Sequence, residues 1–242
     1  LYSSAASDVY KRQDWMYGGA SAWITGSYDP DTDLIYWGIG NPGPDWNPEQ
    51  RPGDNLYSDS VVALNPDTGE LEWYFQFTPN DPYDYDAVQV PVLIDYPAQD
   101  GSMLKLMLFG NRNGFFYILD RETARFINGE PYINLNWAEG LDDAGRPIFT
   151  PQPPGTTTYP GVQGGTNWYS PSYSPSTRLF YMSTWENNGS NFEAQEAEYE
   201  PGRTFLGGRP APPVPGAALP NLARGPINTW TAVSYTHLRA HE

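Results

Sequence analysis

A segment of this chain recurs 145 residues later with the same spacing of turns and aromatic residues. Residues 19–23 and 28–37 form the first copy, and residues 165–168 and 173–182 form the second. Each copy has small residues and a tryptophan, then a proline-containing turn, then an apolar stretch such as residues 34–38. This pattern predicts a β-hairpin with one buried face. The offset equals three periods of about 48 residues, close to blade-like repeats of roughly 40–50 residues.

Composition and two further patterns favour short strands over long helices. The chain has 24 Gly and 25 Pro, with 15% aromatic and only 17% charged residues, which is typical of strands and tight turns. Residues 103–109 and 114–119 predict a second strand pair joined at residues 110–113, and residues 65–69 predict a turn. We therefore expect an all-β fold whose strands repeat radially as a β-propeller, with a two-sheet sandwich as the alternative.

Charge and cysteine content exclude several functions. The formal net charge is −16, which repels a polyanion, so we expect no nucleic-acid partner. Some of the 29 Asp and Glu residues could surround a cation, or they could simply form a solvated surface. The chain has no cysteine, which excludes disulfides and thiolate chemistry within it. No apolar run approaches about 18 residues, so no membrane span is predicted.

The two ends of the chain do not fit the pattern between them. Residues 1–13 and 233–242 resemble translated sequencing-adapter read-through, and we expect both to be non-native. His237 and His241 lie in the second of these segments, so residues 14–232 have no histidine for acid/base catalysis or metal binding. Residues 188–228 are rich in Pro, Gly and Ala without periodicity, which predicts a long irregular loop.

Residues 63–73 resemble the tryptophan-docking motif of the pyrroloquinoline-quinone (PQQ) dependent alcohol dehydrogenases. The matching positions are Ala63, Asn65, Thr68, Gly69 and Trp73, and residues 40–42, 51–57 and 78–86 follow in the order of that family's central blades. The resemblance implies a partial eight-bladed β-propeller with about four blades present, in which Trp73 packs between neighbouring blades. It also implies that earlier and later blades are missing, so we expect the chain as given to be inactive.

The same resemblance assigns candidate catalytic residues. Asp84 matches the family's catalytic carboxylate, which accepts the hydroxyl proton of an alcohol as hydride moves to the cofactor. Arg112 matches the arginine that hydrogen-bonds and polarises the quinone, although a strand-end cation is the simpler role. Asn41 matches an amide-oxygen ligand of the active-site cation, and a Glu from an earlier blade completes that shell in the family. Local sequence alone would make Asn41 a turn residue before Pro42.

Asp86 lies two positions after Asp84, so in an extended segment both carboxylates would point to the same side. Without a cation, two such carboxylates would repel each other. The Asp-Tyr-Asp arrangement resembles the lanthanide-using branch of the family, where an additional negative oxygen ligand suits a trivalent ion. We expect one metal ion at Asn41, Asp84 and Asp86, with a lanthanide favoured and calcium as the alternative. The simplest role for Asp86 is that of a solvated loop acid.

The two copies of the repeat supply the residues expected to contact PQQ. Trp23 matches the tryptophan on which the flat PQQ ring stacks, and Ser21 retains a hydroxyl where relatives usually have Thr. Asn167 and Trp168 in the second copy resemble another cofactor-contacting element, with blade packing as the alternative role.

The resemblance implies oxidation of a primary alcohol to an aldehyde in the bacterial periplasm, with a c-type cytochrome as electron acceptor. A homodimer of the full-length protein is an expectation of the same kind. Two alternatives remain, a quinoprotein aldose dehydrogenase and a non-catalytic propeller scaffold of outer-membrane assembly, which would not need the candidate site residues together. The alcohol is not determined, because Trp37, Tyr83 and Tyr85 fit either an alcohol pocket or a hydrophobic core.

Overall fold

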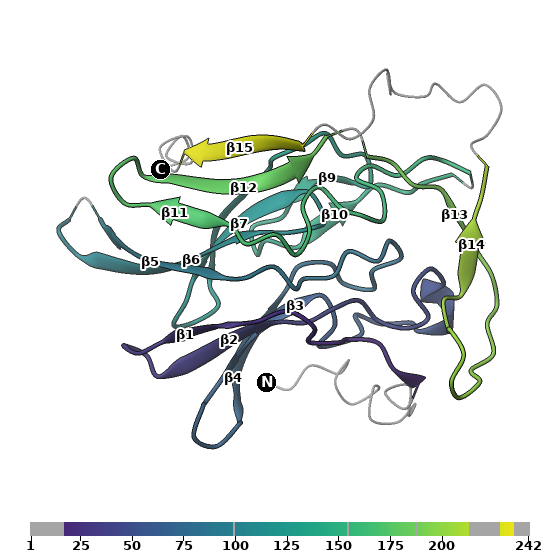
Figure 1. Ribbon diagram of the computed structural model, residues 1–242, viewed down its shortest axis with the longest axis horizontal. Helices are drawn as coiled ribbons and strands as arrows, with labels where there is room; N and C mark the ends of the chain where they lie inside the picture. The colour runs from purple at the N-terminus through teal and green to yellow at the C-terminus, as the bar shows by residue number, and fades with distance from the viewer. Residues whose placement is uncertain (1–16, 99, 154, 187, 213–227, 235–242) are drawn as a thin grey trace.

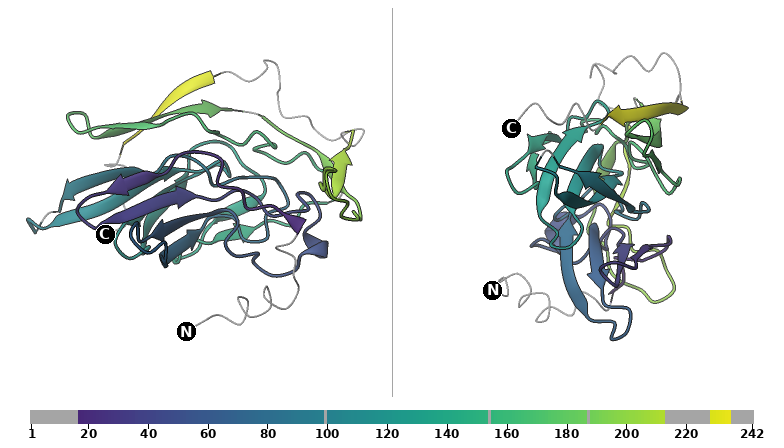
Figure 2. Two further views of the ribbon diagram at one scale, coloured as in Figure 1. Left: turned by 60° about the horizontal axis from the view of Figure 1, so that its bottom comes forward. Right: turned by 90° about the vertical axis from the view of Figure 1, so that its left-hand side faces the viewer.

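The computed structural model describes residues 17–212 and 228–234, apart from residues 99, 154 and 187. Over these residues the chain forms antiparallel β-sheets, with a short 3-10 helix at Pro48–Gln50. Two four-stranded sheets and one three-stranded sheet follow one another along the chain and lie side by side (Figures 1 and 2). The prediction of an all-β fold is confirmed.

Blade 1 is the first four-stranded sheet, with the strand order β1-β2-β3-β4. Its strands are β1 (Ser27–Asp29), β2 (Leu34–Gly38), β3 (Ser60–Leu64) and β4 (Leu71–Gln76). The predicted first hairpin is present, because Tyr28 of β1 pairs with Ile35 of β2. The turn between them begins at Asp29, whose carboxylate accepts hydrogen bonds from the Asp31 N–H and the Thr32 hydroxyl.

Blade 2 is the second four-stranded sheet, with the order β5-β6-β7-β8. Its strands are β5 (Val92–Pro97), β6 (Met103–Gly110), β7 (Phe115–Asp120) and β8 (Phe126–Pro131). The predicted strand pair across residues 110–113 is confirmed, since β6 and β7 pair with Gly110 opposite Phe116.

The β3–β4 and β7–β8 turns share one design. Asn65 in the first turn and Asp120 in the second accept hydrogen bonds from the N–H groups two and three residues later. The fifth turn residue then has a left-handed backbone, at Gly69 with φ +73° and at Ala124 with φ +62°. Glycine adopts this conformation without strain, whereas the Cβ of Ala124 crowds the following carbonyl.

A third sheet begins the next blade. It has the order β11-β12-β15, with β11 (Ser172–Ser174), β12 (Leu179–Trp185) and β15 (Asn228–Ser234). β15 extends two residues into segment 233–242, and the rest of that segment, like residues 1–13, lies outside the described residues. The chain also forms two short ribbons, β9 (Ala138–Leu141) with β10 (Pro147–Phe149), and β13 (Phe192–Ala194) with β14 (Gly208–Pro210). The β13–β14 ribbon lies within segment 188–228, which is therefore less irregular than predicted.

The repeat of 145 residues spans two blades rather than three periods. β11 begins at Ser172, 145 residues after β1 begins at Ser27, and the sheets between the two hairpins are the rest of blade 1, blade 2 and the β9–β10 ribbon. The period of about 48 residues was therefore too short, because the ribbon and the long connecting loops lengthen each repeat. The described residues accordingly form two complete blades and three strands of a third, fewer than the expected number of about four.

Blade 2 is apolar on both faces because both faces are buried. Met107 and Phe109 of β6 belong to a core shared with blade 1, whereas Leu106 and Leu108 belong to a core shared with β12. Successive side chains of a strand point to opposite faces, so alternate residues serve the two cores, and each large apolar side chain contributes about 1.5–3 kcal/mol. A sandwich would bury only one face of each sheet, so this arrangement matches a propeller.

Trp73 of the docking motif lies where the motif predicts. Its ring centroid is 5.5 Å from that of Tyr36 in blade 1. It also lines a hollow that Glu122 of the blade 2 turn borders. The side chain therefore packs at the boundary between the two blades and contributes buried aromatic area.

Candidate active site

The candidate residues lie on loops that emerge from the same end of the blades. Asn41 follows β2 in loop 39–59, Asp84 and Asp86 follow β4 in loop 77–91, and Arg112 lies in the short loop 111–114 between β6 and β7. Strands β2, β4 and β6 run in the same direction within adjoining sheets, so these loops meet at one end of the fold (Figure 1). Ser21 and Asn167 precede the first strands of their blades and therefore lie at that end as well.

Arg112 brings the two predicted carboxylates together. Its Nη1 donates to Asp86 Oδ2 at 2.5 Å, and its Nη2 lies 3.5 Å from Asp84 Oδ2. The other Asp86 oxygen, Oδ1, accepts a hydrogen bond of 2.8 Å from the main-chain N–H of Asn41. The side chains of Arg112 and Asp86 are only 6% and 9% exposed. Asp86 is therefore not a solvated loop acid, and Arg112 is not an exposed cation.

The geometric reason predicted for this convergence was wrong. Residues 81–91 form no strand, and Asp84 has a left-handed backbone with φ +62°. The carboxyl group of Asp81 shapes the bend, since it accepts the N–H groups of Tyr83 at 2.8 Å and Tyr85 at 2.5 Å. Asp84 and Asp86 meet at Arg112 because of this folded loop, not because alternate residues of a strand share a face.

Gly40 lies against the Asp86 carboxylate, and Ser21 lies beside Gly40. The Gly40 N–H donates to the Ser21 carbonyl at 2.9 Å, and a Cβ on Gly40 would lie 2.4 Å from Asp86 Oδ1 and 3.2 Å from Ser21 Oγ. Only glycine allows this close approach of backbone to carboxylate. Trp23, two residues after Ser21, is 45% exposed and is therefore not a core residue.

The two residues of the second predicted cofactor element, Asn167 and Trp168, have different surroundings. The Gly165 N–H donates to the Arg112 carbonyl at 2.9 Å, which places this segment beside the site. Asn167 is buried and its amide is engaged locally, donating to the Gln163 carbonyl and accepting from the Trp168 N–H. These contacts favour the alternative role for Asn167, that of packing within its blade. Trp168 is 53% exposed.

The site contains acidic residues that the sequence interpretation missed. Burial raises the pKa of Asp84 to about 8, against the lowering effect of Arg112, and the nearby carboxyl groups of Asp86, Asp81 and Asp45 raise it further. Burial likewise raises the pKa values of Asp45 and Asp81 to about 6. Their positions within or next to the matched segments 40–42, 51–57 and 78–86 are the signal that could have identified them.

Asp59 is the most isolated of these acids. It is fully buried, and within the described part of the chain neither carboxyl oxygen has a hydrogen-bond partner. Burial raises its pKa well above the ordinary value, and the charges of Asp81 and Asp86 act in the same direction. Carboxyl groups that burial and mutual repulsion keep from ionising are favourable sites for a cation.

The residues present fit an oxygen-coordinated cation. Five carboxyl groups, those of Asp45, Asp59, Asp81, Asp84 and Asp86, lie near one another, and the cations among them are the guanidinium groups of Arg51 and Arg112. Carboxylate and amide oxygens are the donors that hard cations prefer. Among the described residues, no three Asp, Glu or His side chains form a metal-binding group by themselves, so the set needs the Asn41 amide or further donors.

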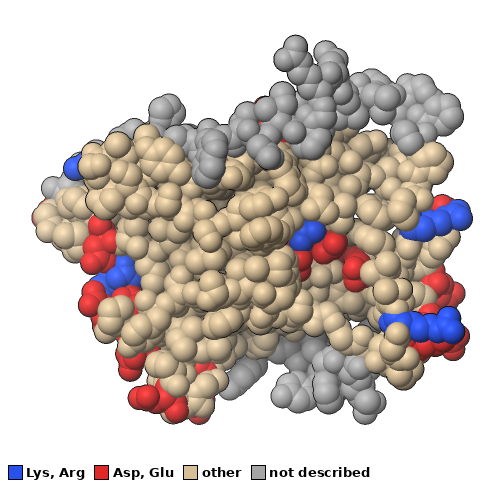
Figure 3. Space-filling model, viewed as in Figure 1, with Lys and Arg blue, Asp and Glu red and all other residues tan. Residues whose placement is uncertain are grey.

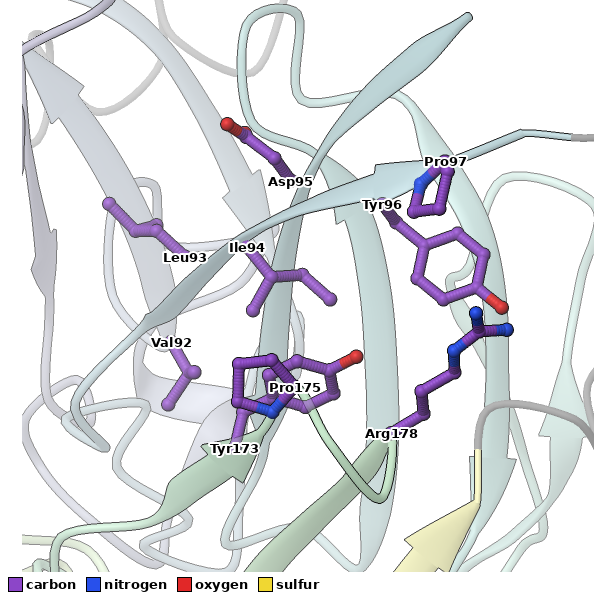
Figure 4. A pocket seen from close by; sticks show the side chains of 9 residues that line it. All are labelled: Val92, Leu93, Ile94, Asp95, Tyr96, Pro97, Tyr173, Pro175 and Arg178. Atoms are coloured by element: carbon purple, nitrogen blue, oxygen red, sulfur yellow. The ribbon is translucent and has the colours of Figure 1, made fainter. Parts of the chain in front are cut away.

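Charged side chains lie together near the middle of the face shown in Figure 3, and the others lie mainly at its edges. A hollow of about 500 Å³ lies elsewhere, between β5 and the β11–β12 turn (Figure 4). Its lining includes Ile94 and Tyr96 of blade 2 with Tyr173 and Arg178 of the next sheet. This hollow contains none of the candidate residues and is part of the groove between neighbouring blades.

The predicted substrate-pocket aromatics belong partly to the core. Tyr85 is fully buried, its hydroxyl donates to the Pro160 carbonyl, and its ring lies 5.5 Å from that of Trp137. Tyr83 is partly buried and packs against the same two rings. Tyr85 is therefore a core residue.

Comparison with known proteins identifies the family. The PQQ family model, described as the glucose/ethanol/alcohol dehydrogenase β-propeller domain, matches residues 3–136, more than half of the chain. The chain belongs to this family. The predicted PQQ dehydrogenase membership and the partial propeller fold are thereby confirmed. The match begins within segment 1–13, whose non-native origin stays a prediction.

Several members of the PQQ dehydrogenase family are similar over most of this chain. The quinoprotein alcohol dehydrogenase PedH of Pseudomonas putida is 42% identical over 205 residues, 80% of this chain and 34% of that protein. The lanthanide-dependent methanol dehydrogenase of Methylacidiphilum fumariolicum is 38% identical over 203 residues, covering 81% and 33%. A solved europium-containing methanol dehydrogenase has a TM-score of 0.76 and 37% identity over 81% of this chain and 35% of that one. The chain thus spans about a third of these relatives. No helix in the described residues is long and apolar enough to cross a membrane.

Proposed function

We propose that residues 14–232 are the central blades of a longer PQQ-dependent dehydrogenase that oxidises a primary alcohol to an aldehyde. Residues 1–13 and 233–242 are non-native in this proposal. The observation that carries it is the contact of Arg112 with both Asp84 and Asp86, next to Asn41. A purely structural contact would compensate its carboxylates fully, whereas burial here raises the pKa of Asp84 to about 8 despite Arg112, which leaves the pair suited to a further cation. The longer protein is the full-length dehydrogenase.

Asp84 acts as the general base. Its side chain is 20% exposed, more than that of Asp86, so it is the carboxylate that a substrate hydroxyl can reach. In its ionised form it accepts the hydroxyl proton of the alcohol on a carboxylate oxygen. Arg112 lies 3.5 Å from Asp84 Oδ2 and cannot itself be deprotonated, so it orients Asp84 and adds positive charge beside the reacting atoms.

When bound, PQQ supplies the two-electron acceptor and the metal ion supplies Lewis-acid polarisation of its carbonyl. Ser21 and the exposed ring of Trp23 would hold the cofactor, with Trp168 as a further contact. Asn167 is proposed only to orient Trp168, because its amide is engaged within its own loop.

Asn41, Asp84 and Asp86 would hold the metal ion, completed by a Glu from another blade of the full-length dehydrogenase. We favour a lanthanide over calcium. The support is the excess of buried carboxyl groups over guanidinium groups around Asp86, because a trivalent ion offsets more negative charge than a divalent one. The names of two relatives, a lanthanide-dependent and a europium-containing methanol dehydrogenase, point the same way.

A c-type cytochrome is the proposed electron acceptor, and the periplasm the proposed compartment. A homodimer of the full-length dehydrogenase belongs to the same proposal. A quinoprotein aldose dehydrogenase is the second candidate, and it would differ in the shape of the substrate pocket rather than in the residues around Arg112.

Reconstitution of the full-length dehydrogenase tests the proposal. The protein is prepared without metal, loaded with PQQ and either calcium or lanthanum, and assayed by alcohol-dependent dye reduction. We expect activity with lanthanum, which Asp86→Ala abolishes and Asp31→Ala, at a side chain 58% exposed, leaves unchanged. Activity with calcium alone would contradict the lanthanide assignment. Activity with neither ion, or with aldoses alone, would contradict alcohol oxidation.

A further inference from the structure

We propose that Arg51 is a positioning residue that joins the two loops of the active site, loop 39–59 with Asn41 and loop 77–91 with Asp84 and Asp86. The inference rests on the proposed function, because it concerns the geometry of the ion and base site described above. It assigns to Arg51 no contact with substrate or cofactor.

Every N–H group of the Arg51 guanidinium donates to the two loops. The side chain is buried, with the residue only 3% exposed. Its five N–H groups reach five neutral oxygen acceptors, three on its own loop and two on loop 77–91. The acceptors are the Pro44 carbonyl at 2.9 Å, the Asp45 carbonyl at 3.0 Å, Asn55 Oδ1 at 2.7 Å, Asn80 Oδ1 at 3.0 Å and the Asp81 carbonyl. Such a set needs the planar fork of arginine, since lysine has three donors on one atom.

One arm of this network leads to Asp84. Arg51 holds the main-chain carbonyl of Asp81, and the Asp81 side chain accepts the N–H groups of Tyr83 and Tyr85. These two N–H groups flank Asp84, so they set the bend in which Asp84 adopts its left-handed backbone. The position of the catalytic carboxylate therefore depends on Arg51 through one intervening residue.

The other arm leads to Asn41. Arg51 holds the main-chain carbonyl of Asp45, and the Asn41 side chain acts to lower the pKa of the Asp45 carboxyl group against the effect of burial. In both arms Arg51 binds the backbone of an aspartate whose carboxyl group interacts with the functional part of the loop. Other hydrogen bonds also join the loops, namely main-chain bonds from Phe77 to Asp59 at 2.8 Å and from Ala87 to Ile39 and Asn80 to Asp54 at 3.2 Å, and the bond from the Asn41 N–H to Asp86 at 2.8 Å. Each of these joins the loops at one point, whereas Arg51 binds them through five acceptors.

The positive charge of Arg51, like the shape of its guanidinium group, suits this position. It faces the buried carboxyl groups of Asp81, Asp59 and Asp45 without forming a direct ion pair with them in its hydrogen-bond set. A buried cation that donates only to neutral oxygens leaves those carboxyl groups available to another cation. Arg112 differs, because it pairs directly with Asp86.

The first test compares Arg51→Lys with Arg121→Lys in the full-length dehydrogenase. Arg121 is equally buried, 4% exposed, and also holds two elements together, but it lies at the opposite end of the blades. Europium(III) chloride is titrated into the metal-free protein, and the luminescence lifetime reports the water molecules bound to the ion. We expect Arg51→Lys to weaken europium binding about 10–100-fold, to add bound water, and to lower kcat more than it raises KM. Arg121→Lys should leave the lifetime unchanged.

A matched pair of smaller changes protects the test against misfolding of Arg51→Lys. Asn55 and Asn80 both accept from Arg51 Nη1, and both have a left-handed backbone, with φ +56° and +51°. Glycine fits that backbone, so Asn55→Gly and Asn80→Gly each remove one acceptor without strain. Only Asn80 lies on the loop that carries Asp84. We expect Asn80→Gly to change the europium lifetime and Asn55→Gly to change it less.

Hydrogen exchange of the metal-free protein tests the role of Arg51 independently of the proposed function. We expect Arg51→Lys to speed exchange in residues 77–91 and Arg121→Lys to leave those residues protected. Wild-type protein that binds no europium would overturn the proposed function while this measurement still decided whether Arg51 joins the loops. Unchanged exchange in residues 77–91, or an unchanged europium lifetime in both Arg51→Lys and Asn80→Gly, would overturn the inference.

Discussion

Two buried arginines lie at opposite ends of β7, and the pKa values of Asp84 beside one and Asp29 beside the other are shifted in opposite directions. Arg112 precedes the strand and contacts Asp84 and Asp86, whereas Arg121 follows it and contacts Asp29 at 2.6 Å and Asp95 at 2.7 Å. At the Arg121 end, burial acts to raise the pKa of Asp29, but hydrogen bonds from Arg121, the Asp31 N–H and Thr32 outweigh it and lower that pKa. At the Arg112 end, burial prevails and raises the pKa of Asp84 to about 8.

The difference lies in how completely each carboxylate is compensated. Asp29 has a guanidinium, an N–H group and a hydroxyl as donors, so its charge is satisfied by the protein alone. Asp84 has one guanidinium at 3.5 Å, shared with Asp86, and further acids around it. The Arg121 end is thus a structural contact between blades 1 and 2 in which the charges compensate each other. The Arg112 end has more negative than positive groups and still favours a cation.

Neutralising one carboxylate at each end tests the difference between the Arg112 end and the Arg121 end most directly. In the full-length dehydrogenase, Asp84→Asn should lower kcat by about 10²–10⁴-fold, because it removes the proposed general base. Asp29→Asn should leave kcat within about threefold of wild type, since it lies at the other end of the blade. Steady-state dye reduction measures both, with PQQ absorbance as the loading control. Retention of a tenth or more of kcat by Asp84→Asn would show that another group takes the proton.

Removing Arg121 should cost stability rather than activity. Arg121→Leu leaves the buried Asp29 without its cation, which typically costs about 3–5 kcal/mol in the free energy of unfolding. The neighbouring Arg125→Leu is the control, because Arg125 is 64% exposed and its pair with Asp120 is long at 3.5 Å, worth about 0–1 kcal/mol. Urea denaturation measures both. Equal losses of unfolding free energy in the two variants would show that the buried contact contributes no more to stability than the exposed pair.

The Arg121 end should also respond to acid. Because the folded-state pKa of Asp29 is lowered, this carboxyl group stabilises the fold above the ordinary value of about 3.9 and loses that contribution as pH falls through the folded-state pKa. Between pH 5 and the onset of acid unfolding, wild-type Tm should therefore fall more steeply than that of Asp29→Asn. Parallel Tm curves for the two proteins would contradict the lowered pKa.

The smallest expected effect lies in the two matched turns. Ala124→Gly should raise the free energy of unfolding by about 0.5 kcal/mol, because relief of the left-handed strain slightly exceeds the entropy that glycine adds to the unfolded chain. Gly69→Ala should lower it by about 1 kcal/mol, with no steric clash involved, since nothing lies within 4 Å of the added Cβ. Thermal denaturation of both variants checks this, and changes of the same sign would contradict the shared turn design.

Much of the fold could be predicted from local sequence. The β1–β2 and β6–β7 hairpins and the turn at Asn65 have short-range signals, because strand alternation and turn chemistry act over a few residues. The number of blades could not be obtained in this way. The β9–β10 ribbon lies between blade 2 and the third sheet, and a repeat length alone cannot distinguish two long periods from three short ones.

The site was predicted through family resemblance more than through geometry. Asp84, Asp86, Asn41 and Arg112 meet as expected, but through a bent loop rather than an extended strand. Arg51 lies in the matched segment 51–57 but, like Asp59, had no predicted role, because the importance of both residues arises from contacts between loops distant in sequence. Only the folded chain shows that their charges are buried together.

The double-sided burial of blade 2 has a consequence for sequence variation. Each residue of β7 from Phe115 to Leu119 is buried, with alternate side chains assigned to two different neighbours. A change of side-chain volume at any of these positions disturbs one interface or the other, so the strand offers natural variation almost no neutral position. Diversity among such dehydrogenases should therefore accumulate in the loops at the ends of the blades, where new substrates can be accommodated without altering the strands that support them.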